Sequence, residues 1–275
     1  MSGSGIGSLI SAPVATRLIA AYHWRIAYLL IGGTVLVVVT AASYFLMRDP
    51  ARVGQMPYGG SPADQGRSTG TSGLSVETAI YTPPFYMLSV MFFCFGFSMF
   101  AFTVHIVPHA SGLGFPAVTA ANVLAVIGCF IIVGRLALGL VGDTFGHRLV
   151  FVIGFILAAA SSLWLLQATK ISSLYLFAAA FGFAGGGMGT SQSPLVADIF
   201  GLKAHGLILA ITNLGFAMGG AVGPLTAGYL FDLTGSYQVS FLGCSVFSLL
   251  GLILTLFLRA AKENPSRTLG HSPVL

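Results

Sequence analysis

The sequence predicts an all-α membrane protein, a bundle of about eight transmembrane helices. Of the 275 residues, 56% are hydrophobic and 7% are charged, whereas a soluble domain of this length carries roughly a quarter charged residues. The mean hydropathy is +0.91. The apolar residues form long continuous runs, which favour helices over the alternating pattern of a transmembrane barrel.

Eight segments are apolar enough and long enough to cross a bilayer, for which a helix needs about 20 residues. In chain order they cover residues 4–21, 26–47, 84–107, 117–141, 149–168, 172–197, 206–231 and 238–258. The first of them gives the weakest signal, because it is short and rich in Gly and Ser. Residues 48–82, between the second and third segments, are polar and rich in Gly, Pro and Ser, and we expect a flexible linker there.

Lysine and arginine residues set the predicted orientation in the membrane. Outside the spans, eight of them lie on the side that holds the linker and both termini, and three lie on the opposite side. Cytoplasmic loops carry the excess of positive charge, so the linker and both termini are predicted to be cytoplasmic. The net charge of +5 is distributed over these loops and does not indicate a nucleic-acid-binding protein. The cysteines all lie in apolar runs, which favours packing over a disulfide framework.

Two stretches of the sequence share one pattern at a spacing of 89 residues. Residues 134–146 read GRLALGLVGDTFG and residues 223–235 read GPLTAGYLFDLTG, and both fit G-x-L-x-x-G-x-x-x-D-x-x-G. Each copy closes the second span of a three-span unit, the first at the cytoplasmic end and the second at the outer end. Inverted units of three spans are typical of secondary transporters. Five identities in thirteen positions can also arise by chance in a chain rich in Gly and Leu, and chance explains the shared aspartate worst.

Several motifs, in the same order along the chain, resemble those of the major facilitator superfamily. GDTFGHR (142–148) is similar to the cytoplasmic loop signature of that family, G-x-x-x-D-x-x-G-x-R. GIGSLISAP (5–13) resembles the glycine and proline motif of its fifth span, and residues 205–241 resemble its eleventh and twelfth spans. The likeness is greatest to the bacterial branch of the monocarboxylate and oxalate/formate carriers.

The resemblance implies a division of the chain in which the first four of twelve spans are absent. Residues 1–47 would form the last two helices of the N-terminal half, and residues 48–82 the cytoplasmic linker. Residues 83–259 would form a complete C-terminal six-helix domain, followed by a cytoplasmic tail over residues 260–275. The protein is accordingly expected as a multi-pass protein of a bacterial inner membrane.

Arg135 is the charged residue that lies deepest inside a predicted span. A charge at the bilayer centre costs ~2.5–3.5 kcal/mol on insertion scales, and such residues are functional by default. Two interpretations are open: the side chain snorkels to the boundary or pairs structurally, or it binds a carboxylate through two parallel hydrogen bonds. Carboxylate carriers of the resembling family have an arginine at this place in the eighth span, which implies a substrate-binding role for Arg135.

Three polar residues within spans, Asn122, Gln192 and Asn213, are candidates for orienting a substrate. Hydrogen bonds between helices explain each of them equally well. The resemblance also shows departures from the family. Animal members have an aspartate where this chain has Ile131, and the oxalate type has a lysine in the eleventh span, which this chain lacks. With one cationic group, a small monoanion is a better expected substrate than a dicarboxylate.

The cytoplasmic turn after residue 141 holds the candidate gating residues. Asp143 and Arg148 are expected to form a charge pair that holds one access state and breaks in the other, and Gly139 and Gly146 belong to the same motif. The alternative is that Arg148 only anchors the topology. His105 and His109, one helical turn apart, are expected as outer-side interface residues, because two ligands without a third make a poor metal site.

The sequence therefore predicts a secondary carrier that moves a small organic anion by alternating access, as a symporter or an antiporter. Its expected partners are the anion, the lipid bilayer and, if transport is proton-coupled, a proton; no cofactor is expected. The alternative is a truncated, non-transporting membrane fragment or interaction partner. An enzyme is not predicted, because the sequence contains no nucleophile–base set, metal cluster or phosphate loop.

Overall fold

The computed structural model describes residues 18, 22, 25–43 and 73–258, and the regular structure in these residues is helical. Seven of the described helices are long and apolar enough to cross a membrane. The predicted all-α membrane class is therefore confirmed. The expected span 4–21 lies outside the described residues, apart from Leu18.

Contacts divide the chain into two units, residues 1–70 and 71–275. In the first unit the described helix is Arg25–Ser43, and nearly all of its side chains are exposed. This helix begins one residue before the second predicted span, 26–47, and the last residues of that span, 44–47, are outside the described part of the chain. The expected tail at residues 260–275 is also outside it.

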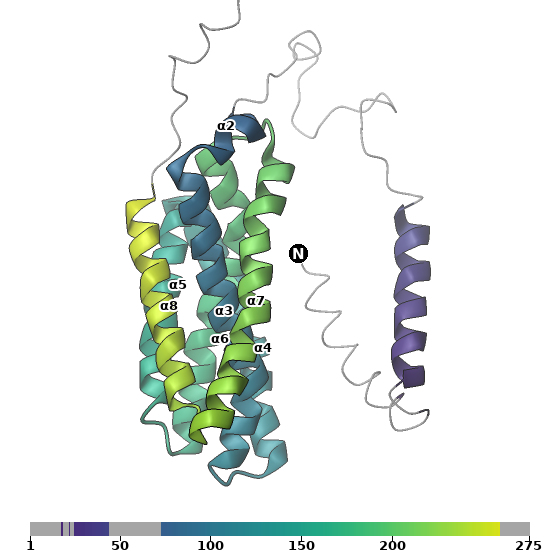
Figure 1. Ribbon diagram of the computed structural model, residues 1–275, viewed down its shortest axis with the longest axis vertical. Coiled ribbons are helices and arrows are strands. Elements are labelled where there is room, and N and C mark those ends of the chain that lie inside the picture. Colours follow the sequence, from purple (N-terminus) through teal and green to yellow (C-terminus); the bar gives the residue numbers. More distant parts are fainter. Residues whose placement is uncertain (1–17, 19–21, 23–24, 44–72, 259–275) are drawn as a thin grey trace, which may run out of the picture. The chain divides into compact units, whose positions relative to one another are not determined.

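The described part of the second unit consists of six long helices and a short one (Figure 1). The helices are α2 (Val76–Ile80), α3 (Pro83–Gly112), α4 (Ala117–Phe145), α5 (His147–Leu165), α6 (Ile171–Phe200), α7 (His205–Thr234) and α8 (Gln238–Phe257). Each long helix matches a predicted span, and its ends differ from the predicted ones by five residues at most.

The long helices fall into two classes by length. Helices α3, α4, α6 and α7 have 29 or 30 residues, whereas α5 and α8 have 19 and 20. At 1.5 Å per residue, the longer class measures about 45 Å, which exceeds the ~30 Å of a bilayer's hydrocarbon core. The ends of these four helices therefore extend into the interfacial regions, where charged side chains are tolerated.

Phenylalanine rings fill much of the interior of this unit. The ring of Phe102 in α3 lies with its centre 4.9–5.0 Å from those of Phe177, Phe181 and Phe241, which belong to α6 and α8. A second cluster surrounds Phe151 of α5 nearer the other end. These buried rings stabilise the packing of the long helices against one another.

The six long helices form two three-helix groups, α3–α5 and α6–α8. The first helix of each group packs mainly against helices of the other group. Helix α3 packs mainly against α7 and α8, and α6 packs mainly against α4 and α5 in the same manner. Helices α5 and α8 also meet each other. Because α3 corresponds to α6, α4 to α7 and α5 to α8, this is the pairing expected of the repeat found in the sequence.

Glycines of the repeat lie at equivalent helix crossings. A Cβ atom at Gly134 in α4 would lie 2.1 Å from the carbonyl oxygen of Phe183 in α6, and one at Gly223 in α7 would lie 2.4 Å from that of Phe97 in α3. Helices α3 and α6 are related by a spacing of 86 residues. This spacing separates Pro108 from Pro194, the prolines inside the two helices, and it also separates Phe97 from Phe183. The repeated glycines thus allow the same close backbone approach twice.

The last glycine of each copy ends a helix. Gly146 follows α4 with φ +94°, and Gly235 follows α7 with φ +68°. Only glycine adopts such angles without strain, which explains why both copies keep it. Asp143 and Asp232 each lie two residues before the end of their helix and are exposed.

The last part of the expected linker is ordered rather than flexible. Ser75 caps α2 by accepting a hydrogen bond from the Thr78 backbone at 3.3 Å, and the Leu74 N–H donates to the Phe200 carbonyl at the end of α6 at 2.8 Å. Leu74 and Ala79 are buried against the six-helix unit. The burial of these two apolar residues and the serine cap together stabilise this segment, although the residues around it have the composition of a loop.

Candidate functional site

Arg135 lies well inside α4, ten residues or about 15 Å from its C-terminal end. The side chain is half-buried, and its Nε atom is buried. Its backbone is in the tightest part of the α4–α6 crossing: a Cβ atom at Gly186 in α6 would lie 2.1 Å from the Ile131 oxygen and 3.0 Å from the Arg135 nitrogen. Two helices in direct backbone contact therefore fix the position of this arginine.

Two of the three predicted orienting residues share the depth of Arg135. Gln192 lies eight residues before the end of α6, and Asn213 lies eight residues after the start of α7. Both are therefore about 12 Å from the same end of the domain. Gln192 is half-buried and its Nε2 atom has no hydrogen-bond partner in the described residues, whereas Asn213 is exposed.

Asn122 does not belong with these residues. It is the sixth residue of α4, thirteen positions before Arg135, which is about 20 Å along the helix axis. A small anion bound to the guanidinium cannot reach that far. Both residues lie in the same predicted span, but thirteen positions of helix place their side chains at different depths.

The expected charge pair between Asp143 and Arg148 is not formed in this structure. Arg148 donates from Nε to the Thr255 carbonyl at 2.9 Å and from Nη2 to the Leu256 carbonyl. These are carbonyls of the last turn of α8, where helix partners are missing and a positive charge is favoured. Gly146 turns the chain between the two motif residues, and the packing of α5 against α8 brings Arg148 to that helix end instead.

Gly139 and Gly146 serve the same turn in different ways. A Cβ atom at Gly139 would lie 3.8 Å from the Thr190 methyl group, an ordinary contact between α4 and α6. Gly146 both ends α4 and precedes α5, and it requires its positive φ. The predicted gating motif is thus a compact helix–helix connection tied to α8 through Arg148.

A histidine at the start of α7 joins this helix to α6, and the sequence does not single it out. His205, the first residue of α7, lies with Nε2 3.0 Å from the Ser193 hydroxyl of α6. Its Nδ1 atom is buried without a hydrogen-bond partner in the described residues. The only signal in the sequence is the polar run TSQSP at 190–194, which the structure places opposite this histidine.

At the opposite end of the domain, His105 of α3 connects three segments. Its Nε2 lies 2.9 Å from the Pro224 carbonyl, which can only accept, so Nε2 carries a proton. Its Nδ1 then accepts from the Tyr237 hydroxyl at 3.3 Å. Burial and the nearby Asp232 carboxylate raise the pKa of Tyr237, which keeps this hydroxyl protonated and able to donate.

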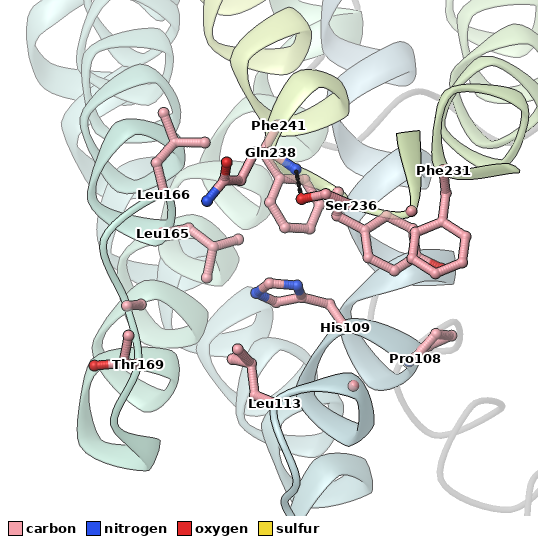
Figure 2. A pocket seen from close by; sticks show the side chains of 14 residues that line it. Pro108, His109, Leu113, Leu165, Leu166, Thr169, Phe231, Ser236, Gln238 and Phe241 are labelled. Carbon is pink, nitrogen blue, oxygen red and sulfur yellow. Dashed lines mark hydrogen bonds between the residues drawn. The ribbon is translucent and has the colours of Figure 1, made fainter. Parts of the chain in front are cut away.

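A cavity of about 280 Å³ lies beside this network, at the same end of the domain. It is bounded by the end of α3, the α5–α6 connection and the α7–α8 connection, and Figure 2 shows the His109 imidazole among Leu113, Leu165 and Gln238. Arg135 does not line this cavity. In the part of the chain that the structure describes, no three His, Cys, Asp or Glu side chains gather as a metal site would require.

A family model described as Major Facilitator Superfamily matches residues 1–143 and 123–274. Together the two matches cover nearly the entire chain. The chain belongs to the Major Facilitator Superfamily. Membership agrees with the packing of the six long helices as two three-helix groups.

Curated relatives of this facilitator protein include monocarboxylate transporters of animals. It is 29% identical over 291 residues to monocarboxylate transporter 12 of Rattus norvegicus, covering 96% of this chain and 59% of the relative. It is 26% identical over 253 residues to monocarboxylate transporter 13 of the same species, covering 91% of this chain and 56% of the relative. The chain thus spans somewhat more than half the length of these relatives, and the bacterial branch suggested by the motifs stays a prediction.

Solved structures give the same fold. The E. coli fucose:proton symporter FucP matches with a TM-score of 0.64 at 15% sequence identity, covering 89% of this facilitator chain and 59% of that chain. At this identity the likeness concerns the fold alone. It is the fold in which the sequence analysis placed residues 83–259.

Proposed function

We propose that this facilitator protein is a secondary active transporter for a small organic anion of the monocarboxylate type, working by alternating access. Arg135 carries the proposal. It is the one Asp, Glu, Lys or Arg residue among those described that lies more than three residues inside a membrane-crossing helix. The relatives named monocarboxylate transporters support the choice of a carboxylate.

The chemistry of Arg135 suits a single carboxylate. A planar guanidinium offers two parallel charge-assisted hydrogen bonds to a carboxylate, and an incoming anion offsets the cost of holding a cation inside the membrane. Gln192 and Asn213, at the same depth in α6 and α7, would orient the rest of the anion. A second cation at this depth is missing from the described helices, which favours a monoanion over a dicarboxylate.

The cytoplasmic connection between α4 and α5 would control access. In this structure Arg148 is bound to the end of α8, and Asp143 is exposed and forms no ion pair with any residue that the structure describes. In the proposed gate, Arg148 therefore stays bound to the end of α8, and Asp143 forms an ion pair with another group in the opposite access state. Gly139 and Gly146 would permit the accompanying movement of α4 on α6. Coupling to a proton would deliver the energy for accumulation.

The orientation follows the positive charges of the described connections. Arg148 and Lys203 lie at the end of the domain that holds α2, and Lys170 lies at the opposite end. The end with more cations is proposed as cytoplasmic, in a cell membrane. The alternative of a non-transporting fragment has no observation in its favour.

Uptake into proteoliposomes tests the proposal. The full chain is reconstituted, and uptake of labelled acetate, lactate, pyruvate and benzoate is measured with and without a pH gradient. Arg135→Ala and Arg135→Lys should abolish saturable uptake, because neither side chain offers a bidentate clamp. Lys170→Ala, which removes one exposed cation from the outer connection, is the charge-matched control and should transport normally. Unchanged uptake in Arg135→Ala would refute the proposed role.

A further inference from the structure

The repeat builds a related cavity at each end of the six-helix unit. The inner cavity, of about 300 Å³, lies among residues 146–148, the end of α6 and Leu258. The outer cavity, of about 280 Å³, lies among residues 235–237, the end of α3 and Thr169. Each residue that lines the inner cavity has an equivalent in the lining of the outer one, at the 89-residue or 86-residue spacing that relates the two units.

The two cavities differ in charge. The inner one is lined by Arg148 and Asp198, and their equivalents in the outer one are Tyr237 and Gly112. None of the residues that line the outer cavity is Asp, Glu, Lys or Arg. A doubly charged ligand would lose its hydration there without compensation, so the outer cavity suits a neutral or singly charged molecule.

The outer cavity is of similar volume but is not crossed by a cationic side chain. Arg148 reaches across the inner end to the carbonyls of α8, whereas the Tyr237 hydroxyl bonds to His105. A Cβ atom added at Gly112 would meet no atom within 4 Å. The change from aspartate to glycine thus leaves open space in the outer cavity.

His109 supplies an imidazole to the outer cavity, at the position where the inner cavity has Leu195, and the polar side chains of Thr169, Ser236 and Gln238 line the same cavity. Its ring stands edge-on to Tyr237 and Phe241, at interplanar angles of 87° and 84°, which fixes its orientation (Figure 2). Its Nε2 atom is buried and has no hydrogen-bond partner in the described residues. Buried polar atoms are nearly always hydrogen-bonded, so a ligand group or an ordered water would complete the hydrogen bonding of this nitrogen, as it would for His147 Nδ1 in the inner cavity.

The walls indicate the rest of the ligand. Phe231, Tyr237 and Phe241 form a stack with ring centres 4.3 and 5.7 Å apart along the cavity. A flat ring can continue such a stack, and aromatic pairs prefer these separations. The cavity volume of about 280 Å³ lies just below the range for small-molecule sites, which are roughly 300–1,000 Å³, and so suits a small ligand.

We propose that the outer cavity is a second binding site, separate from Arg135, for a small aromatic monocarboxylic acid whose carboxyl group hydrogen-bonds His109 Nε2. The acid and the imidazole share one proton, so the pair is either a neutral acid on a neutral ring or a carboxylate on an imidazolium. Both forms give the ring nitrogen the partner that it lacks.

Calorimetric titration of the full chain in lipid nanodiscs with benzoate tests this site. His109→Phe keeps the ring volume and its edge-on contacts but removes Nε2, and we expect affinity about tenfold lower, as for one lost hydrogen bond to a charged group. Gly112→Leu fills the open space and should abolish binding. The matched control is Gly206→Leu at the opposite end of the domain, where an added Cβ also meets no atom within 4 Å.

Arg135→Ala separates this site from the proposed transport site. Benzoate binding that persists in Arg135→Ala and is lost in Gly112→Leu supports the outer site. Binding lost in Arg135→Ala but kept in His109→Phe and Gly112→Leu places benzoate at the transport site only and overturns the outer site, while the proposed function stands. Absence of benzoate binding to the unaltered protein overturns the outer site as well, and water then occupies the cavity.

Discussion

Replacing Gly134 by alanine should strongly destabilise the domain, because this residue lets α4 and α6 touch through their backbones. The added Cβ would lie 2.1 Å from the Phe183 carbonyl oxygen, which is backbone and cannot swing aside. A relaxed contact of a methyl carbon needs roughly 3.5 Å, so the two helices would have to separate by more than 1 Å at the crossing. Overpacking of this kind costs about 3 kcal/mol.

Thermal unfolding in detergent measures the effect. Cys94 and Cys244 are fully buried, so a thiol-reactive fluorophore reports their exposure as the helices separate. A loss of about 3 kcal/mol corresponds to an apparent melting temperature about 6–12 °C lower for a domain of this size. Gly189→Ala in α6 is the control, because its Cβ would meet nothing within 4 Å and alanine favours a helix by about 0.5–1 kcal/mol.

The repeat makes the same prediction a second time. Gly223→Ala, whose Cβ would lie 2.4 Å from the Phe97 oxygen in α3, should lower the melting temperature to a similar extent as Gly134→Ala. The reasoning fails if Gly134→Ala melts like Gly189→Ala. It also fails if only one of the two repeat glycines is sensitive, because the crossings would then not be equivalent.

Three further substitutions test single contacts by the same melting assay. Arg148→Ala leaves two carbonyls at the end of α8 without their donor and should lower the free energy of unfolding by about 2–3 kcal/mol, with partial recovery in Arg148→Lys. An unchanged melting temperature in Arg148→Ala would contradict the proposed contact with α8. Tyr237→Phe removes the hydroxyl that donates to His105 and should cost about 1 kcal/mol, whereas an equal loss in the exposed Tyr229→Phe would show that the effect is unspecific. Leu74→Ala should cost about 2–3 kcal/mol because Leu74 is buried against the six-helix unit, and no loss would mean that the segment before α2 is undocked.

The helices and their repeat could be predicted from the sequence because both depend on local features. A membrane-crossing helix satisfies its own backbone, so composition and length suffice to find it. The repeated glycines at Gly134 and Gly223 could be recognised because a missing Cβ has one main use inside an apolar helix, the close approach of another backbone. The same holds for Gly146 and Gly235, whose positive φ ends a helix in each copy.

Side-chain partners could not be predicted in this way. Asp143 and Arg148 are close in sequence, and a pair between them is the simplest expectation, but the nearest unsatisfied acceptors belong to α8, more than a hundred residues later. Asn122 and Arg135 share a helix, but register places them about 20 Å apart. Docking of Leu74 likewise depends on the end of α6, which the composition of the linker does not report.

The repeat also explains why the two ends of one fold carry different chemistry. Arg148 and Tyr237 are equivalent positions, 89 residues apart, and each follows the capping glycine by two residues. An arginine there is long and cationic and reaches the carbonyls that end α8, whereas a tyrosine is shorter and neutral and meets His105 instead. The inner end is thereby tied across the bundle, and the outer end keeps a cavity beside His109. Changes at position 148 should therefore act first on stability, and changes around the outer cavity should act first on ligand binding.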